Sequence, residues 1–233
     1  MDYYVKVSPE LLESMTLAAI ESFYYGDGME KPEDEITEVS KEILGHIWGY
    51  RKVEAHRTVF FLDRMSLSIS STRMPDSVHD LNNRAARLKK SVVELFSPEL
   101  TLLGDFHTHP HPKKSESIVK KDKLYRFSPE DFGSFVSDDL IWESAGNNPV
   151  MLVITVCKRR KMAMDAMTHI SRNTATYPIG QLRFWISAVV GFAHVGKRSR
   201  VGKRQHTMNK SAKVELIIDN YIQSLEGEQF ETD

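Results

Sequence analysis

The chain has 233 residues, of which 41% are hydrophobic, a formal net charge of −1 and a single cysteine. Near-neutral charge gives no sign of a nucleic-acid or membrane-surface binder, and one cysteine excludes an internal disulfide framework and is typical of a reducing compartment. The N-terminus lacks the basic start and apolar run of a signal peptide, and no stretch approaches the roughly 18 apolar residues of a membrane span. We therefore expect a soluble, cytoplasmic protein without a membrane partner.

The first part of the chain alternates segments with strand-like and helix-like apolar spacing. In chain order we expect a strand over Tyr3–Val7, a helix capped by Ser8, strands over Glu42–Arg51 and Thr58–Ser70, a helix over Ser77–Phe96 and a strand over Leu100–Phe106. In the second of these helices the apolar residues recur at helical spacing, with Arg and Lys between them; they are Val78, Leu81, Ala85, Leu88, Val92 and Leu95.

The later part of the chain combines a second core strand with polar connecting segments. We expect a basic loop over Pro112–Arg126, a helix that starts at Ser128, a strand over Pro149–Lys158, further sheet or helix over Lys161–His169 and Tyr177–Phe192, a mobile basic connector over Val195–Lys213 and an amphipathic helix over Lys213–Leu225. The fold class expected is α/β (α+β), in one domain with residues 1–160 as its core and residues 161–233, including the connector 195–213, as a C-terminal extension.

Three histidines alternate with other residues in the segment "LTLLGDFHTHPHP", which runs from Leu100 to Pro112. On an extended segment alternate residues point the same way, so His107 and His109 project two imidazoles to one side. Two imidazoles are half of a zinc site, since zinc takes imidazole nitrogens in a tetrahedral arrangement. A catalytic zinc also needs a third protein ligand and an open position for water.

Asp131 is the best placed third ligand, because it lies in the first turn of the helix that follows the histidines. Ser128, which caps this helix, lies three positions earlier on the same side of that turn, so its hydroxyl can face the metal water or a substrate carbonyl. Hydrolysis further requires a base near the metal water. Glu42, at the start of its strand, is the candidate for that base.

Together these residues resemble the JAMM signature of the JAB/MPN metalloproteases, which consists of a glutamate, a His-x-His-Pro and a Ser-x-x-Asp. The matching residues are Glu42, His107-Thr108-His109-Pro110 and Ser128-Pro129-Glu130-Asp131. The order of elements is also similar, and the resemblance covers roughly Tyr3 to Lys158. It implies a JAB/MPN-like fold, similar to that of cytidine deaminases, with a mixed central β-sheet flanked by helices.

One spacing departs from the family pattern. Ser128 follows His109 by 19 positions, which is longer than usual in the family, and the excess is the lysine-rich stretch over Lys113–Arg126. We interpret this stretch as a loop insertion at the rim of the cleft, because insertions in surface loops cost little free energy. Asp131 reaches the metal only if the insertion leaves the following helix in place.

The resemblance implies that His107, His109 and Asp131 bind one Zn²⁺ per chain, with a water in the fourth position. It further implies that Glu42 accepts the proton of that water and delivers it to the leaving amine, and that Ser128 donates a hydrogen bond to the oxyanion. The expected enzyme is a metallo-isopeptidase or peptidase of prokaryotic or phage type. It would cleave after the C-terminal tail of ubiquitin or a ubiquitin-like modifier.

Each of these residues also has a purely structural interpretation. His107 and His109 can be polar loop residues, Ser128 and Asp131 can serve only to start a helix, and Glu42 can be a solvated strand end. These interpretations remain open for each residue taken alone, and the three elements in order favour the metal site.

Three further side chains are interpreted mainly as structural. His111, flanked by prolines, is expected at the rim of the cleft, and His46 as a core or edge histidine or a neighbour of the site. Cys157 follows an apolar strand and is expected to be a buried thiol rather than a nucleophile.

Two other functions fit parts of the sequence. Some MPN domains lack the zinc ligands and act as scaffolds, which the intact signature argues against. RadC-like proteins carry a similar His-x-His-Pro segment and associate with nucleic acid, and this chain has basic stretches over Lys113–Arg126 and Lys197–Lys213. Neither stretch is interleaved with aromatic residues as single-strand binding favours, so nucleic acid is not the expected partner.

Overall fold

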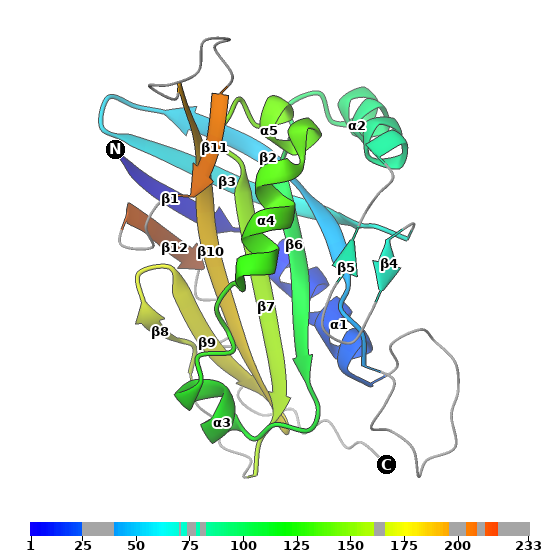
Figure 1. The fold of residues 1–233 in the computed structure, drawn as a ribbon, viewed down its shortest axis with the longest axis vertical. Helices are drawn as coiled ribbons and strands as arrows, with labels where there is room; N and C mark the ends of the chain where they lie inside the picture. Colours follow the sequence, from blue (N-terminus) through cyan, green and yellow to red (C-terminus); the bar gives the residue numbers. More distant parts are fainter. Residues whose placement is uncertain are drawn as a thin grey trace.

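The computed structural model of the chain describes residues 1–24, 40–69, 71–73, 78–79, 83–160, 166–195, 204–208 and 213–218 (Figure 1). The strands are β1 (Asp2–Val7), β2 (Leu44–Val53), β3 (Arg57–Leu67), β4 (Thr72–Arg73), β5 (Val78–His79), β6 (Thr101–His111), β7 (Val150–Lys158), β8 (Thr168–Ser171), β9 (Thr174–Ile179), β10 (Leu182–Val195), β11 (Arg204–Met208) and β12 (Val214–Ile218). The helices are α1 (Pro9–Tyr24), α2 (Asn83–Phe96), α3 (Glu116–Lys121), α4 (Pro129–Ser137) and α5 (Asp139–Ser144). Within these ranges no helix has both the length and the apolar character that crossing a membrane requires.

Among the described residues, ten strands form one mixed sheet in the order β12-β1-β3-β2-β6-β7-β10-β9-β8, with β11 paired to β10. The β1–β12, β1–β3 and β6–β7 pairs are parallel, and the other pairs of this sheet are antiparallel. β4 and β5 pair separately. The chain is therefore an α+β protein with a mixed central sheet, and strands from both ends of the sequence share that sheet.

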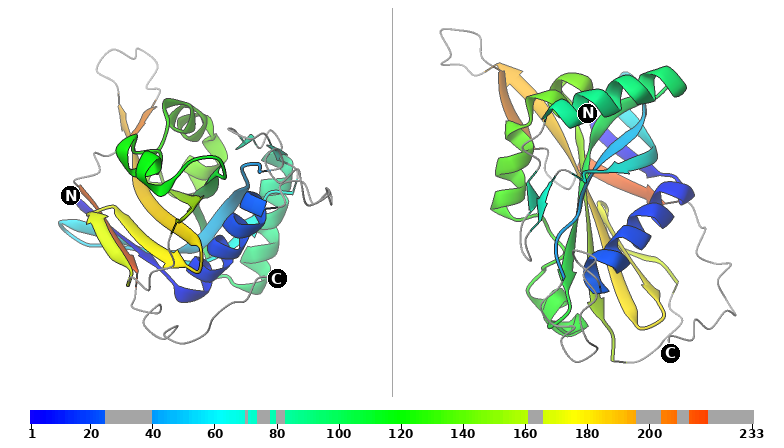
Figure 2. Two further views of the ribbon diagram at one scale, coloured as in Figure 1. Left: turned by 90° about the horizontal axis from the view of Figure 1, so that it is seen from below. Right: turned by 90° about the vertical axis from the view of Figure 1, so that its right-hand side faces the viewer.

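Helices cover both faces of the sheet (Figure 2). α1 packs on one face against β3, β6 and β7, whereas α4 and α5 lie on the opposite face, where α5 contacts β6. α2 lies at one end of the molecule, beside the end of β6 where that strand starts (Figure 1). The central strand β6 thus has α1 on one side and the α4–α5 pair on the other.

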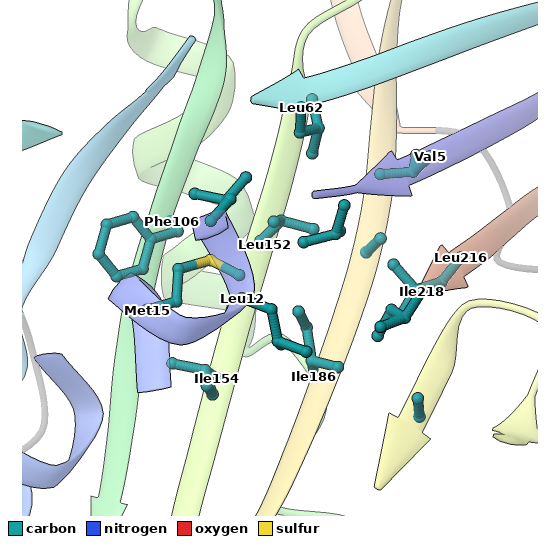
Figure 3. Close-up of a cluster of buried hydrophobic side chains, with 14 of the residues drawn as sticks. Val5, Leu12, Met15, Leu62, Phe106, Leu152, Ile154, Ile186, Leu216 and Ile218 are labelled. Atoms are coloured by element: carbon teal, nitrogen blue, oxygen red, sulfur yellow. The ribbon is translucent and has the colours of Figure 1, made fainter. Parts of the chain in front are cut away.

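The larger hydrophobic core lies beneath α1 (Figure 3). Leu12 and Met15 of α1 pack against Phe106 of β6 and against Leu152 and Ile154 of β7, and all five side chains are buried. Because these residues recur at helical spacing in α1 and at every second position in β7, the sequence brings one apolar face of each element to the same core.

A second core lies beneath α4 and α5. It contains Phe135 and Trp142 from these helices, together with Trp48, Leu102 and Met151 from the sheet. The indole N–H of Trp142 donates to the Phe135 carbonyl oxygen at 2.7 Å, so its polar atom is satisfied in this apolar setting. This core joins α4 and α5 to β2, β6 and β7 of the sheet.

Strand β6 is longer than the sequence analysis expects. It runs past Phe106 to His111, because β7 continues to pair with it in parallel as far as the His111–Cys157 position. The interpretation of His107 and His109 as loop residues is therefore wrong, since both lie inside a central strand.

The first predicted helix after the β2–β3 pair also differs. It starts at Asn83 rather than Ser77, and Val78–His79 belong to β5. Leu88, Val92 and Leu95, which recur at helical spacing, do not face the core, because these side chains are 61%, 54% and 77% exposed. The helix instead buries the small side chain of Ala86, which lets its backbone approach the sheet.

The C-terminal part contains more sheet than expected. Tyr177–Phe192 spans the β9–β10 hairpin, where Gly180 takes a positive φ of 53° at the turn. The expected connector over Val195–Lys213 contains β11, which pairs with β10. The amphipathic helix expected over Lys213–Leu225 is wrong for its described part, because β12 alternates buried and half-buried residues with the period of a strand. Residues 161–165, 196–203, 209–212 and 219–225 of these expectations lie outside the described residues.

Candidate metal centre

Strand β6 brings two imidazoles together by simple alternation. His107 and His109 lie on the face of β6 that α4 covers, and their Nε2 atoms are 3.1 Å apart. Both side chains are buried, at 5% and 8% exposure. An imidazole nitrogen carries either a hydrogen or a lone pair. Two such nitrogens that are buried face to face therefore need either a proton that one donates to the other or a cation that both bind.

The start of α4 supplies a carboxylate to the same point. Ser128 is the N-cap of α4, and its hydroxyl accepts a hydrogen bond from the Asp131 N–H at 3.1 Å. The Asp131 carboxylate in turn accepts from the Ser128 N–H at 2.6 Å, which completes a capping box. The predicted helix start at Ser128 is thus confirmed, and the cap fixes the rotamer of Asp131.

In this rotamer Asp131 faces both histidines. Its Oδ1 lies 3.2 Å from His107 Nε2, and its Oδ2 lies 3.5 Å from His109 Nε2. Ligands of a tetrahedral zinc at about 2.0–2.1 Å from the metal lie roughly 3.3–3.4 Å from one another. The observed separations, measured from each histidine to a different oxygen of Asp131, are close to that spacing. One ligand atom from each of His107, His109 and Asp131 lies within 4.8 Å of the others, so this buried cluster can hold a metal ion.

Glu42 lies beside this cluster. Its Oε1 is 3.8 Å from His109 Nε2, and the residue is 5% exposed. It precedes β2, whose described start is Leu44, but hydrogen bonds to Thr108 keep its segment against β6. The Ile43 N–H donates to Thr108 Oγ1 at 2.9 Å, and the Thr108 N–H donates to the Ile43 carbonyl oxygen at 3.0 Å. The interpretation of Glu42 as a solvated strand end is wrong.

The electrostatics of the cluster also favour a cation. Burial acts to raise the pKa of Asp131, but its contacts with His107 and His109 outweigh burial and hold that pKa below its usual range. Burial lowers the pKa of His107, whereas in His109 the opposing effects of Asp131 and Glu42 prevail over burial and raise the pKa. The Asp131 and Glu42 carboxylates thus both act on His109, at a place where they would stabilise a cation.

A pocket of about 540 Å³ opens onto these residues. Glu42, His109, Ser128 and Asp131 line it, so the base, two ligands and the hydroxyl predicted from sequence share one space. His107 lies deeper and does not line it. The sequence therefore identified groups that the fold does bring together, although their chemical roles remain predictions.

The segment between the histidines and α4 is not a simple loop. It contains α3, whose Val119 is fully buried against Cys157 and Trp185. Glu116 of α3 forms ion pairs with Arg183 and Arg159, at 3.3 and 3.6 Å. The expectation of a basic loop over Pro112–Arg126 is wrong in this respect. Because the segment is docked on β7 and β10, its extra length does not displace α4.

The structure also places the three side chains that were interpreted as structural. His111 lines the pocket, where burial, together with Lys114 and His109, lowers its pKa to about 4. His46 is buried in β2 opposite Asp105 of β6. Cys157 is buried as predicted, and burial followed by the nearby Glu116 raises its pKa to about 12.

Sequence reasoning missed two residues of the site. Thr108, which ties the Glu42 segment to β6, also hydrogen-bonds Ser22 of α1 at 2.9 Å on the opposite face from the histidines. Asp105 lies two positions before His107 in β6. Its burial, followed by the charges of Asp138 and Asp131, raises its pKa well above its usual range. The alternation of Asp105, His107 and His109 was a signal in the sequence, whereas no pattern marked Thr108.

Comparison with known proteins adds no family assignment. No model of a protein family matches this chain, and no curated protein matches it. The assignment of a function therefore depends on the geometry of the His107–His109–Asp131 cluster and its neighbours.

Proposed function

We propose that this protein is a zinc-dependent metallo-isopeptidase or peptidase of the JAMM type. The observation that carries the proposal is the convergence of His107, His109 and Asp131 at ligand spacing, with Glu42 3.8 Å from His109. Two imidazoles and one carboxylate are a common ligand set of catalytic zinc and leave one position open. The resemblance to the JAB/MPN signature supports the same assignment, and with it a JAB/MPN-like fold.

His107, His109 and Asp131 would hold the zinc, which would act as a Lewis acid and make a water molecule more acidic. The Glu42 carboxylate takes a proton from the attacking water, whose oxygen adds to the substrate carbonyl carbon. The same carboxyl then gives that proton to the leaving nitrogen as the C–N bond breaks. Ser128 accepts the Asp131 N–H through its oxygen, so its own hydroxyl hydrogen is available to donate to the carbonyl oxygen as negative charge develops there.

The expected substrate is the C-terminal tail of a ubiquitin-like modifier, free or conjugated. An extended tail can enter the pocket, whose lining includes the apolar side chains of Pro110, Pro112 and Leu124. Glycines in such a tail would let its backbone approach the metal closely, because they carry no side chain that clashes. Such a hydrolase would act either on the free modifier or on its conjugates.

The test combines metal content with hydrolysis. Protein purified without chelator should contain about one zinc per chain and cleave one or more of a panel of ubiquitin-like fusions, with loss of cleavage on chelation. Glu42→Gln should keep the zinc and lose about 10²–10⁴-fold in kcat. Glu130→Gln, an exposed neighbour in the first turn of α4, serves as the matched control and should cleave normally. Zinc-loaded protein that cleaves no fusion, or Glu42→Gln with full activity, would contradict the proposal.

A further inference from the structure

The pocket beside the metal cluster has one strongly cationic wall. Lys113, Lys114, Lys123 and Arg126 line it, and all four are exposed. They come from the two ends of the α3 segment, between β6 and α4. Within the described part of the chain, none of the four forms an ion pair with a carboxylate, so their charges are available to a ligand.

The carboxylates of the pocket do not neutralise this wall. The lining contains two, Glu42 and Asp131, and both lie against His109. Glu116, the acidic residue of α3, forms ion pairs with Lys120, Arg159 and Arg183. A divalent cation bound at the cluster would offset the charges of Glu42 and Asp131, which leaves four positive charges on the wall unopposed.

The backbone holds part of this wall in a fixed position. Lys123 follows the C-cap of α3 with a positive φ of 54°, a conformation that glycine adopts more readily. Its N–H donates to the Lys120 carbonyl oxygen, and the next N–H, of Leu124, donates to Val119. Val119 is in turn buried against Trp185. The cationic side chain therefore projects from a turn that is anchored to the sheet.

We infer that this wall selects substrates with acidic side chains within a few residues of the scissile bond. The inference rests on the proposed hydrolase function for the location of that bond. Acidic peptide chains match the wall in charge, and the pocket, at about 540 Å³, takes a few residues of an extended chain. Specific nucleic-acid interfaces bury about 600 Å² or more of protein surface and extend over a basic face rather than one pocket wall.

The binding test uses zinc-loaded Glu42→Gln protein, which holds a peptide without turning it over. Three labelled peptides share one central sequence and carry two flanking residues that are Glu, Gln or Lys. The Glu peptide should bind roughly tenfold more tightly than the Gln peptide, at a few-fold per exposed charge pair, and the preference should shrink as salt rises. Equal affinity of the Glu and Gln peptides would overturn the inference.

Two charge-matched variants locate the effect. Replacing Lys113, Lys114, Lys123 and Arg126 by Gln should abolish the preference for the Glu peptide. Replacing Arg84, Arg87, Lys121 and Lys158 by Gln removes the same charge from exposed positions that do not line the pocket, and should leave the preference intact. Equal loss in both variants would show a general charge effect and overturn the inference. A single-stranded DNA that binds more tightly than the Glu peptide and displaces it would also overturn the inference, and would favour nucleic acid as the ligand.

A cleavage assay with the wild-type protein separates this inference from the proposed function. The substrates are the three peptides and a modifier fusion whose linker carries the same Glu, Gln or Lys residues. Cleavage with equal KM for all three charges would leave the hydrolase proposal standing and overturn the inference. Selective binding of the Glu peptide without cleavage of any substrate would overturn the hydrolase proposal and support the charge selectivity of the wall.

Discussion

Asp131 serves two purposes with one carboxylate. It closes the capping box of α4 through the Ser128 N–H, and it faces both histidine Nε2 atoms. The structural interpretation of Ser128 and Asp131 as helix-start residues is therefore correct but incomplete. A carboxylate whose rotamer is fixed by its own helix cap is already in place before a metal arrives, which lowers the entropic cost of binding.

Substituting Asp131 should separate these two purposes. Asp131→Asn keeps an oxygen that can accept from the Ser128 N–H, so it should retain most of the cap while its zinc affinity falls by at least tenfold. Asp131→Ala should lose the zinc and also about 1 kcal/mol of stability with the cap. Zinc content by elemental analysis and unfolding in urea measure the two effects, and Glu130→Ala is the control. Full zinc content in Asp131→Ala would exclude Asp131 as a ligand.

Cys157 should make stability depend on alkaline pH. Burial raises its folded-state pKa to about 12, whereas the unfolded thiol ionises near its ordinary value. Because the folded state keeps the proton that the unfolded state loses, this thiol has no effect at neutral pH and destabilises the fold above about pH 9, by roughly 1 kcal/mol per pH unit. The difference in unfolding free energy between wild type and Cys157→Ala, measured at pH 8 to 10.5, should change accordingly. A constant difference would contradict this assignment.

The residues of the site could largely be predicted, because alternation in a strand and spacing in a helix are local. His107 and His109 share a face whatever the rest of the chain does, and Ser128 and Asp131 share a helical turn. What brings Glu42 to them is the double hydrogen bond between Ile43 and Thr108, a contact between distant segments that no local pattern encodes.

At the scale of elements, α3 anchors to the sheet the segment that connects β6 to α4. Glu116→Gln removes the charge that faces Arg159 and Arg183, whose side chains are 6% and 7% exposed. Breaking a buried pair costs about 3–5 kcal/mol, and Glu116 is partly exposed, so we expect a loss of about 2 kcal/mol in unfolding free energy. Glu94→Gln removes an exposed pair with Lys90 and should cost about 0.5 kcal/mol or less.

If α3 holds α4 in place, the zinc affinity of Glu116→Gln should fall together with its stability. Competition with a chelator measures that affinity, and Glu94→Gln should match the wild type. Equal stability of the two variants would show that the ion pairs of α3 contribute nothing to the fold.

The elements that sequence analysis predicted well are those with a strong local signal. Val150–Lys158 forms β7 and Ser128 starts α4, each within one residue of the expected bounds. The sequence predicts a helix at β12 because five residues of "VELII" carry little information on their period, and pairing with β1 decides their conformation. The exposure of Leu88, Val92 and Leu95 in α2 could not be predicted, because helical spacing shows that a face is apolar and not what it contacts.

At the scale of the whole molecule, the close approach of β6 and β7 sets the stability of the sheet. A Cβ atom on Gly104 would lie 1.7 Å from the Val150 carbonyl oxygen, so Gly104→Ala must push the two strands apart. We expect a loss of at least 1–3 kcal/mol of unfolding free energy. Gly133→Ala on the open side of α4 meets no atom within 4 Å and should instead gain about 0.5–1 kcal/mol. Urea unfolding of both variants tests this, and a stable Gly104→Ala would contradict the strand spacing.

The strand order of the sheet was beyond the reach of the sequence. Mixed sheet and flanking helices follow from the alternation of apolar periods, but nothing local indicates that β1 lies between β3 and β12. Such pairings depend on matching edges and on the burial that they share, and they are decided when the whole sheet assembles.

The place of β1 between β3 and β12 has a consequence for how the protein is made. β1 is synthesised well before its outer neighbour, which consists of residues 214–218 and leaves the ribosome about 10–40 s later at typical elongation rates. Throughout that interval one row of β1 amides and carbonyls has no strand to pair with, which is the kind of open edge that recruits other chains. Pairing of β12 with β1 is therefore a late step of folding. A nascent chain that ends before β12 exposes an unpaired edge of β1, which can associate with other chains.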